Sequence, residues 1–116
     1  MTALSATLQR GMRRVYLMQA GARYKVGMSS QPGTRAAALA RQCGESVCIV
    51  AASGLMEADL ARGLERALHN ELQAHQITGE WYATHPDVIA ACMPHMSPYT
   101  PVTIAECRAA LCQRLG

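Results

Sequence analysis

The alternation of apolar and polar side chains in the first third of the chain predicts two strands joined by a tight turn. Residues 15–20 are mainly apolar, and residues 23–29 alternate between apolar and polar or small side chains. Gly21 lies between the two runs and supplies the backbone freedom of a hairpin turn. Because neighbouring strand residues point to opposite faces, Lys25 is expected on the face opposite Tyr24.

Helical periodicity and turn residues predict the remaining elements. They are a helix over 35–42 ended by Gly44, a buried strand over 46–53, a helix over 57–75, a short strand over 80–84, a helix over 86–93 opened by Pro86, and a last helix over 103–115. The helix over 57–75 has the strongest pattern, because Leu60, Leu64, Leu68 and Leu72 repeat every four residues. We expect these leucines to form one buried stripe.

This order of elements predicts an α+β fold, a small α/β sandwich with a central, three-stranded, mainly antiparallel sheet flanked by helices. The chain divides into an N-terminal helix or arm over 1–14, a domain over 15–93, and a segment over 94–116. That last segment is expected to hold a proline-rich linker and a C-terminal helix, since Pro94, Pro98 and Pro101 interrupt regular structure.

Composition places the chain among small cytoplasmic proteins. It has 116 residues, of which 50% are hydrophobic and 4% aromatic, with no phenylalanine. No apolar run approaches the ~20 residues of a membrane span, and arginines interrupt the N-terminus where a secretory signal would be apolar. The odd count of 5 cysteines is expected to be reduced and mostly structural.

Charge is distributed unevenly and suggests a polyanion partner. Residues 1–44 hold seven bases and no acid, whereas residues 45–116 hold four bases and all 8 acids. A basic half of this kind is either a solvated surface or a contact for the phosphate backbone of DNA. The arginine candidates for backbone contact are Arg13, Arg14, Arg23 and Arg41.

Five short motifs occur in an order that resembles the GIY-YIG nuclease superfamily. They are Val15-Tyr16-Leu17, Lys25-Val26-Gly27, Arg35 eight residues after Gly27, the run Leu64-Glu65-Arg66-Ala67-Leu68-His69, and Gly79-Glu80-Trp81-Tyr82. The sequence looks most like a compact branch of that superfamily, with a Glu-x-x-x-His helix and a late Gly-Glu-Trp-aromatic motif. The resemblance covers roughly residues 15–92 and defines the GIY-YIG-like domain over 15–93.

The resemblance implies a divalent-metal-dependent endonuclease that hydrolyses phosphodiester bonds in DNA. It implies that Glu65 binds Mg²⁺ or Mn²⁺, and that Arg35 neutralises charge developing on the scissile phosphate. It further implies that Tyr16 orients or deprotonates the attacking water. Lys25 stands where the superfamily usually has a tyrosine, and is expected to clamp phosphate or act as a base. His69 would orient Glu65 or reach the leaving group.

Ordinary structural roles remain open for the same residues. A tyrosine such as Tyr16 in an apolar strand is usually a packing residue. Glu65 and His69 are four apart on one helix, which is also the spacing of a solvent-facing pair. Trp81 is expected to anchor the long helix to the sheet rather than to stack on a nucleobase.

Other chemistries have less support. Cys43 and Cys48 lack the close spacing of a zinc ribbon, and a metal held by His85, Cys92 and His95 is a remote alternative. Walker, dinucleotide-binding and serine-hydrolase motifs are missing from the sequence. Two rival functions remain: a non-catalytic DNA-binding module on the same scaffold, and a protein-interaction domain of a phage or mobile element.

Overall fold

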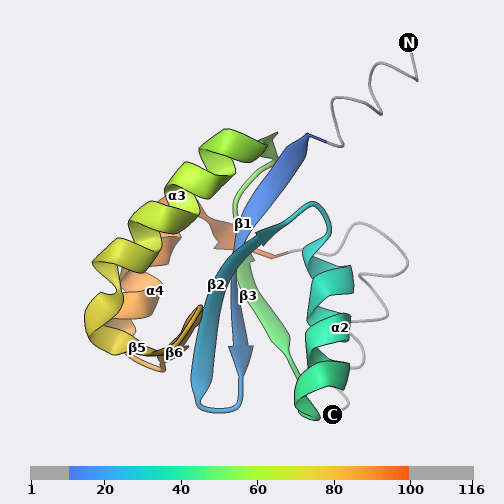
Figure 1. Cartoon of the computed structure of the whole chain (residues 1–116), viewed down its shortest axis with the longest axis vertical. Coiled ribbons are helices and arrows are strands. Elements are labelled where there is room, and N and C mark those ends of the chain that lie inside the picture. Colours follow the sequence, from blue (N-terminus) through green and yellow to red (C-terminus); the bar gives the residue numbers. More distant parts are fainter. Residues whose placement is uncertain (1–10, 100–116) are drawn as a thin grey trace.

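The computed structural model describes residues 11–99 and shows an α+β fold built on an antiparallel sheet (Figure 1). The three predicted central strands are β1 (Met12–Ala20), β2 (Arg23–Ser29) and β3 (Cys48–Ala52). Strand β1 is the middle one, and it pairs antiparallel with both β2 and β3. The predicted fold class is therefore confirmed.

Short strands widen this sheet beyond the predicted three. The order is β5-β6-β2-β1-β3-β7, and β4 pairs separately with β1. Strand β6 (Trp81–Ala83) is the predicted short strand, whereas β4 (Met56–Glu57), β5 (Gln76–Thr78) and β7 (Ser97–Pro98) were not predicted. Strands of two or three residues carry too little alternation to be recognised in a sequence.

Helices cover both faces of the sheet (Figure 1). Helix α2 (Pro32–Cys43) packs on one face; α3 (Ala58–Glu71) and α4 (Pro86–Cys92) pack on the other. The 3₁₀ turns η1 (Gln73–His75) and η2 (Met93–His95) follow α3 and α4, respectively. Proline occupies the first turn of both α2 and α4, where its missing N–H costs nothing.

Two separate apolar clusters result, one on each side of the sheet. Val15, Leu17 and Val26 belong to the cluster under α3 and α4, whereas Tyr16 and Met18 belong to the cluster under α2. This alternation along β1 is the period-two pattern of a strand that is buried on both faces. It sends Tyr16 toward α2.

The leucine stripe of α3 is only partly buried, which corrects the prediction. Leu68 and Leu72 are 1% exposed, Leu64 is half-buried, and Leu60 is 63% exposed. Each four-residue step overshoots the 3.6-residue turn by about 40°, so the leucines drift around the helix and Leu60 reaches solvent. Ala61 is buried in its place.

Trp81 packs on the opposite face from the one predicted. It lies against the cluster under α2 and therefore does not anchor α3. Its neighbour Tyr82 is 1% exposed and belongs to the cluster under α3. The predicted role was assigned to the wrong member of the pair, because a one-residue shift in a strand exchanges the faces.

Parts of the predicted arm over 1–14 and of the segment over 94–116, including the helix over 103–115, lie outside the described residues. Within the described part, β1 already begins at Met12, and β7 joins the edge of β3. Met96 is buried in the cluster under α3 and α4. Among residues 11–99, no helix has the length and apolar character needed to cross a membrane.

Candidate functional site

Tyr16 is fixed against Gly27 across the β1–β2 pair. The two residues are direct partners in the antiparallel register, and Tyr16 is 2% exposed. A Cβ added to Gly27 would lie 2.5 Å from the Tyr16 hydroxyl oxygen and 2.7 Å from Cζ. The phenol therefore occupies the space that any larger residue at position 27 would need.

Arg35 approaches this phenol from the start of α2, where its own side chain is exposed. Its backbone N–H donates to the carbonyl of Gln31, and its guanidinium is within hydrogen-bonding reach of the Tyr16 hydroxyl. Burial raises the pKa of Tyr16 to about 12, although the hydrogen bond from Arg35 opposes this rise. The hydroxyl is accordingly protonated at neutral pH and can donate a hydrogen bond.

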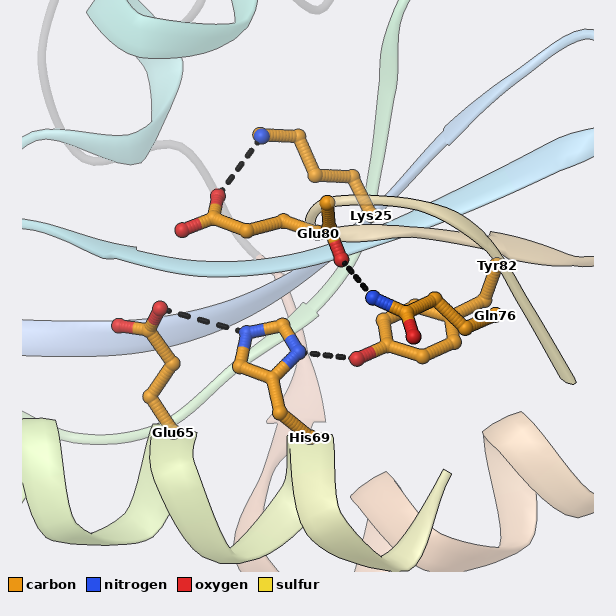
Figure 2. Close-up of polar contacts among 7 residues, drawn as sticks. Lys25, Glu65, His69, Gln76, Glu80 and Tyr82 are labelled. Atoms are coloured by element: carbon orange, nitrogen blue, oxygen red, sulfur yellow. Dashed lines mark hydrogen bonds and ion pairs between the residues drawn. The ribbon is translucent and has the colours of Figure 1, made fainter. Parts of the chain in front are cut away.

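Lys25 is a buried base with a specific carboxylate partner. Its residue exposure is 6%, and its Nζ lies 2.7 Å from Oε2 of Glu80 (Figure 2). The same Nζ is 5.2 Å from the centre of the Trp81 ring, a distance within the range of a cation–π contact. Lys25 shares its sheet face with Tyr16 and holds the side chain of Glu80.

Helix α3 contributes Glu65 and His69 to the same region. His69 Nε2 lies 3.3 Å from Oε1 of Glu65, and His69 Nδ1 is hydrogen-bonded to the Tyr82 hydroxyl (Figure 2). A carboxylate oxygen is an acceptor, so Nε2 carries the proton and Nδ1 accepts from the tyrosine. The buried Tyr82 thus fixes the imidazole, and the imidazole orients Glu65.

Glu65 and Glu80 form a close pair of carboxyl groups. One ligand atom from each of Glu65, His69 and Glu80 falls within 4.8 Å of the other two. Burial, followed by the charge of Glu80, raises the pKa of Glu65. Burial would also raise the pKa of Glu80, but the Lys25 ammonium outweighs it and lowers that pKa. The two shifts differ in direction because Glu80, unlike Glu65, has the Lys25 ammonium as a partner.

The position of Glu80 at the sheet edge explains how residues from both faces come together. Strand β6 pairs with β2 only over Arg23–Lys25, and the turn before it carries Gly79 in the left-handed conformation (φ 53°). Glu80 leaves this turn at the open edge of β2, between Lys25 on one face and α3 on the other (Figure 2). An open hollow of about 190 Å³ lies there, lined by Glu65, His69 and Glu80 among others.

The predicted catalytic residues therefore form two linked groups. Tyr16 and Arg35 form one group, and Glu65 and His69 belong to the other, which Lys25 joins through Glu80. The charges of Glu80 and Glu65 also act on the pKa of Tyr16, so the two groups are electrostatic neighbours. Glu65 faces the sheet edge rather than the far side of its helix.

The four arginines predicted to contact DNA are spread along the fold. Arg14 is the strand partner of Ser29, and the guanidinium of Arg13 donates to the carbonyl of Met12. Arg23 instead forms an ion pair of 2.6 Å with Glu45 and stacks 4.2 Å from the centre of the Trp81 ring. Arg41 is exposed in the last turn of α2.

Glu80 and Tyr82 are the site residues that sequence reasoning missed. Their motif was recognised, yet neither was named as a member of the site. A signal existed for Glu80, because a lysine on a buried strand needs a compensating carboxylate. Tyr82 carried no comparable signal, since nothing in the sequence pairs it with His69.

The fold and the charged cluster define a compact α+β domain of a kind related to nuclease-type domains. Residues 13–97 match the T5orf172 domain, so the chain belongs to this family, which is associated with phages and mobile elements. No curated protein and no solved structure gave a match to this chain.

Proposed function

We propose that this protein is a GIY-YIG-like, divalent-metal-dependent endonuclease that hydrolyses phosphodiester bonds in DNA. The observation that carries the proposal is the cluster of Glu65, His69 and Glu80 beside the Tyr16–Arg35 pair, in a chain of the T5orf172 family. Carboxylates for a cation and an arginine for a phosphate are the two components that metal-assisted phosphodiester hydrolysis needs.

The donor set suits a hard divalent cation. Glu65 and Glu80 offer carboxylate oxygens, the ligands that Mg²⁺ and Mn²⁺ prefer, and His69 orients one of them. The raised pKa of Glu65, due to burial and then to Glu80, marks a pair of carboxyl groups whose repulsion a divalent charge would relieve. When bound, such a cation supplies Lewis-acid stabilisation of phosphate oxygens.

The protein's own groups have distinct roles in this proposal. The exposed Arg35 guanidinium binds the scissile phosphate and stabilises its developing negative charge. Tyr16, with a pKa of about 12 that burial raises, orients the attacking water as a hydrogen-bonding group rather than as a base. Lys25 positions Glu80 through their ion pair, in place of the predicted role as base or phosphate clamp.

Contacts to the DNA backbone would extend from the site along the basic first half of the chain. Arg14 lies opposite Ser29 and two residues before Tyr16 in β1, Arg23 is held beside Glu45 next to the hairpin turn, and Arg41 lies in the last turn of α2. Such contacts bind without reading sequence and weaken with salt. Arg13 is assigned the same role.

Cleavage of supercoiled plasmid tests the proposal. We expect nicking with Mg²⁺ or Mn²⁺ and none with a chelator. Activity should fall at least about 100-fold in Glu65→Gln and in Arg35→Ala. Glu71→Gln is the matched control, because Glu71 is an exposed carboxylate on the same helix. Equal nicking by all four proteins would indicate a contaminating nuclease and refute the catalytic proposal.

A non-catalytic DNA-binding module is the second candidate. The observation that favours it is the ion pair of Lys25, which occupies the usual tyrosine slot and leaves no second hydroxyl there. This function predicts salt-sensitive DNA binding, measured by fluorescence anisotropy, that survives Glu65→Gln with no cleavage under any metal. Loss of activity together with retained binding in Glu65→Gln would instead support the nuclease.

A further inference from the structure

We propose that His75, His85 and Asp87 form a second metal site, one that takes a borderline transition-metal cation such as Zn²⁺. One ligand atom from each of the three residues falls within 4.8 Å of the other two. His75 Nε2 lies 3.2 Å and His85 Nδ1 lies 3.5 Å from the same atom, Oδ2 of Asp87. Two imidazoles and one carboxylate are a three-ligand set of the kind that zinc binds with a position left open for water.

The N-cap of α4 and the stacking of two imidazoles hold the donor atoms close together. His85 Nδ1 accepts a hydrogen bond from the backbone N–H of Asp87 at 3.1 Å, as the N-cap of α4. The same nitrogen lies 3.5 Å from Oδ2 of Asp87, so a cation bound through Nδ1 would exchange the N-cap hydrogen bond for a coordinate bond beside that oxygen. The His75 and His85 rings are stacked with centroids 4.2 Å apart, which holds both nitrogens beside that oxygen.

The site is accessible and distinct from the Glu65 cluster. His85 and Asp87 are exposed, and His75 is half-buried. An open hollow of about 290 Å³ between the end of α3 and α4 is lined by His75, Asp87 and Glu71 among others. Cations and water can therefore reach the donors. Imidazole ligands favour zinc or related metals over Mg²⁺, the cation expected at Glu65.

The positions of the ligands would let a bound metal fasten the β5–β6 hairpin. His75 directly precedes β5, and His85 follows β6, so the two imidazoles bracket the β5–β6 hairpin at its base. Figure 1 shows this hairpin at the C-terminal end of α3. Glu80 lies in the turn at the other end of the hairpin. A bound cation would join η1 to the start of α4 and fasten the base of the segment that carries Glu80.

Titration of the full chain with Zn²⁺ in a calorimeter tests the site. The ligand variants are His75→Gln, Asp87→Asn and His85→Asn, of which the last keeps a good N-cap. His95→Gln is the control, because His95 is an exposed histidine outside the cluster. We expect one zinc per chain in the wild type and the control, with affinity at least about tenfold weaker in each ligand variant.

Two further readouts separate this site from zinc bound by cysteines. With Co²⁺, imidazole and carboxylate ligands give visible bands without the intense near-ultraviolet sulfur-to-cobalt band of thiolates. Zinc at about 100 times its Kd should raise the folded-to-unfolded ratio about 100-fold and slow amide exchange in the β5–β6 hairpin. A sulfur-to-cobalt band, or unchanged affinity in His75→Gln and His85→Asn, would overturn the proposal.

Discussion

Replacing Gly27 by alanine is the sharpest single test of how Tyr16 is held. The added Cβ would lie 2.5 Å from the Tyr16 hydroxyl oxygen and 2.7 Å from Cζ, both below the 3.0 Å that real Cβ atoms respect. Gly27 does not have a positive φ, so the backbone itself tolerates alanine. The whole cost therefore comes from displacing a phenol that is 2% exposed and packed under α2.

The expected magnitude follows from this overlap. Overpacking a closed core by one methyl group costs about 1–3 kcal/mol. For a domain of this size, each kcal/mol lowers Tm by roughly 4–8 °C. The shifted hydroxyl would also lose its approach to Arg35, so we expect cleavage activity to fall along with stability. Thermal unfolding and urea titration measure the first effect, and plasmid nicking measures the second.

Two variants make this prediction refutable. Gly63→Ala is the matched control, because Gly63 is an exposed residue of α3 and an added Cβ there meets nothing within 4 Å. Alanine at this helical position should stabilise the protein by about 0.5–1 kcal/mol. Adding Tyr16→Phe to Gly27→Ala removes the nearest contact but keeps Cζ, so it should recover only part of the loss. A Tm of Gly27→Ala equal to that of wild type would refute the packing argument.

Three further predictions concern charge and burial. Without metal, Glu65→Gln should stabilise the protein, because burial and Glu80 raise the pKa of Glu65. Wild type therefore loses stability as the pH rises above 4.5, the ordinary pKa of this carboxyl group. The stability advantage of the variant, measured by urea titration, must grow toward neutral pH rather than stay constant. Lys25→Met should lower the free energy of unfolding by about 1.5 kcal/mol, because Glu80 loses a charged hydrogen bond but can partly rehydrate. An unchanged midpoint of urea unfolding would contradict the ion pair. Burial raises the pKa of Cys92 to about 11, so a thiol reagent near pH 8 should label the exposed Cys43 and leave Cys92 unlabelled. Peptide mass mapping measures the labelling, and equal labelling of the two cysteines would contradict the burial of Cys92.

The sequence by itself determined the elements whose cause is local. Alternation placed Tyr24 and Lys25 on opposite faces of β2, as found. Pro86 opens α4, and Gly44 ends α2 in the left-handed conformation (φ 71°), since both effects depend on the backbone chemistry of one residue. The order of the short motifs along the chain also identified the residues that were predicted to form the candidate site.

Only the tertiary structure decided which side chains meet. The face of a three-residue strand depends on the strand with which it pairs, and this pairing turned Trp81 toward α2 and Tyr82 toward His69. The partner of Lys25 is Glu80, which is 55 residues away along the chain. Such contacts follow from sheet register and helix packing, and neither propensity nor periodicity contains that information. The motifs in the sequence pointed to Glu65 as a site carboxylate, and the fold placed Glu80 beside it.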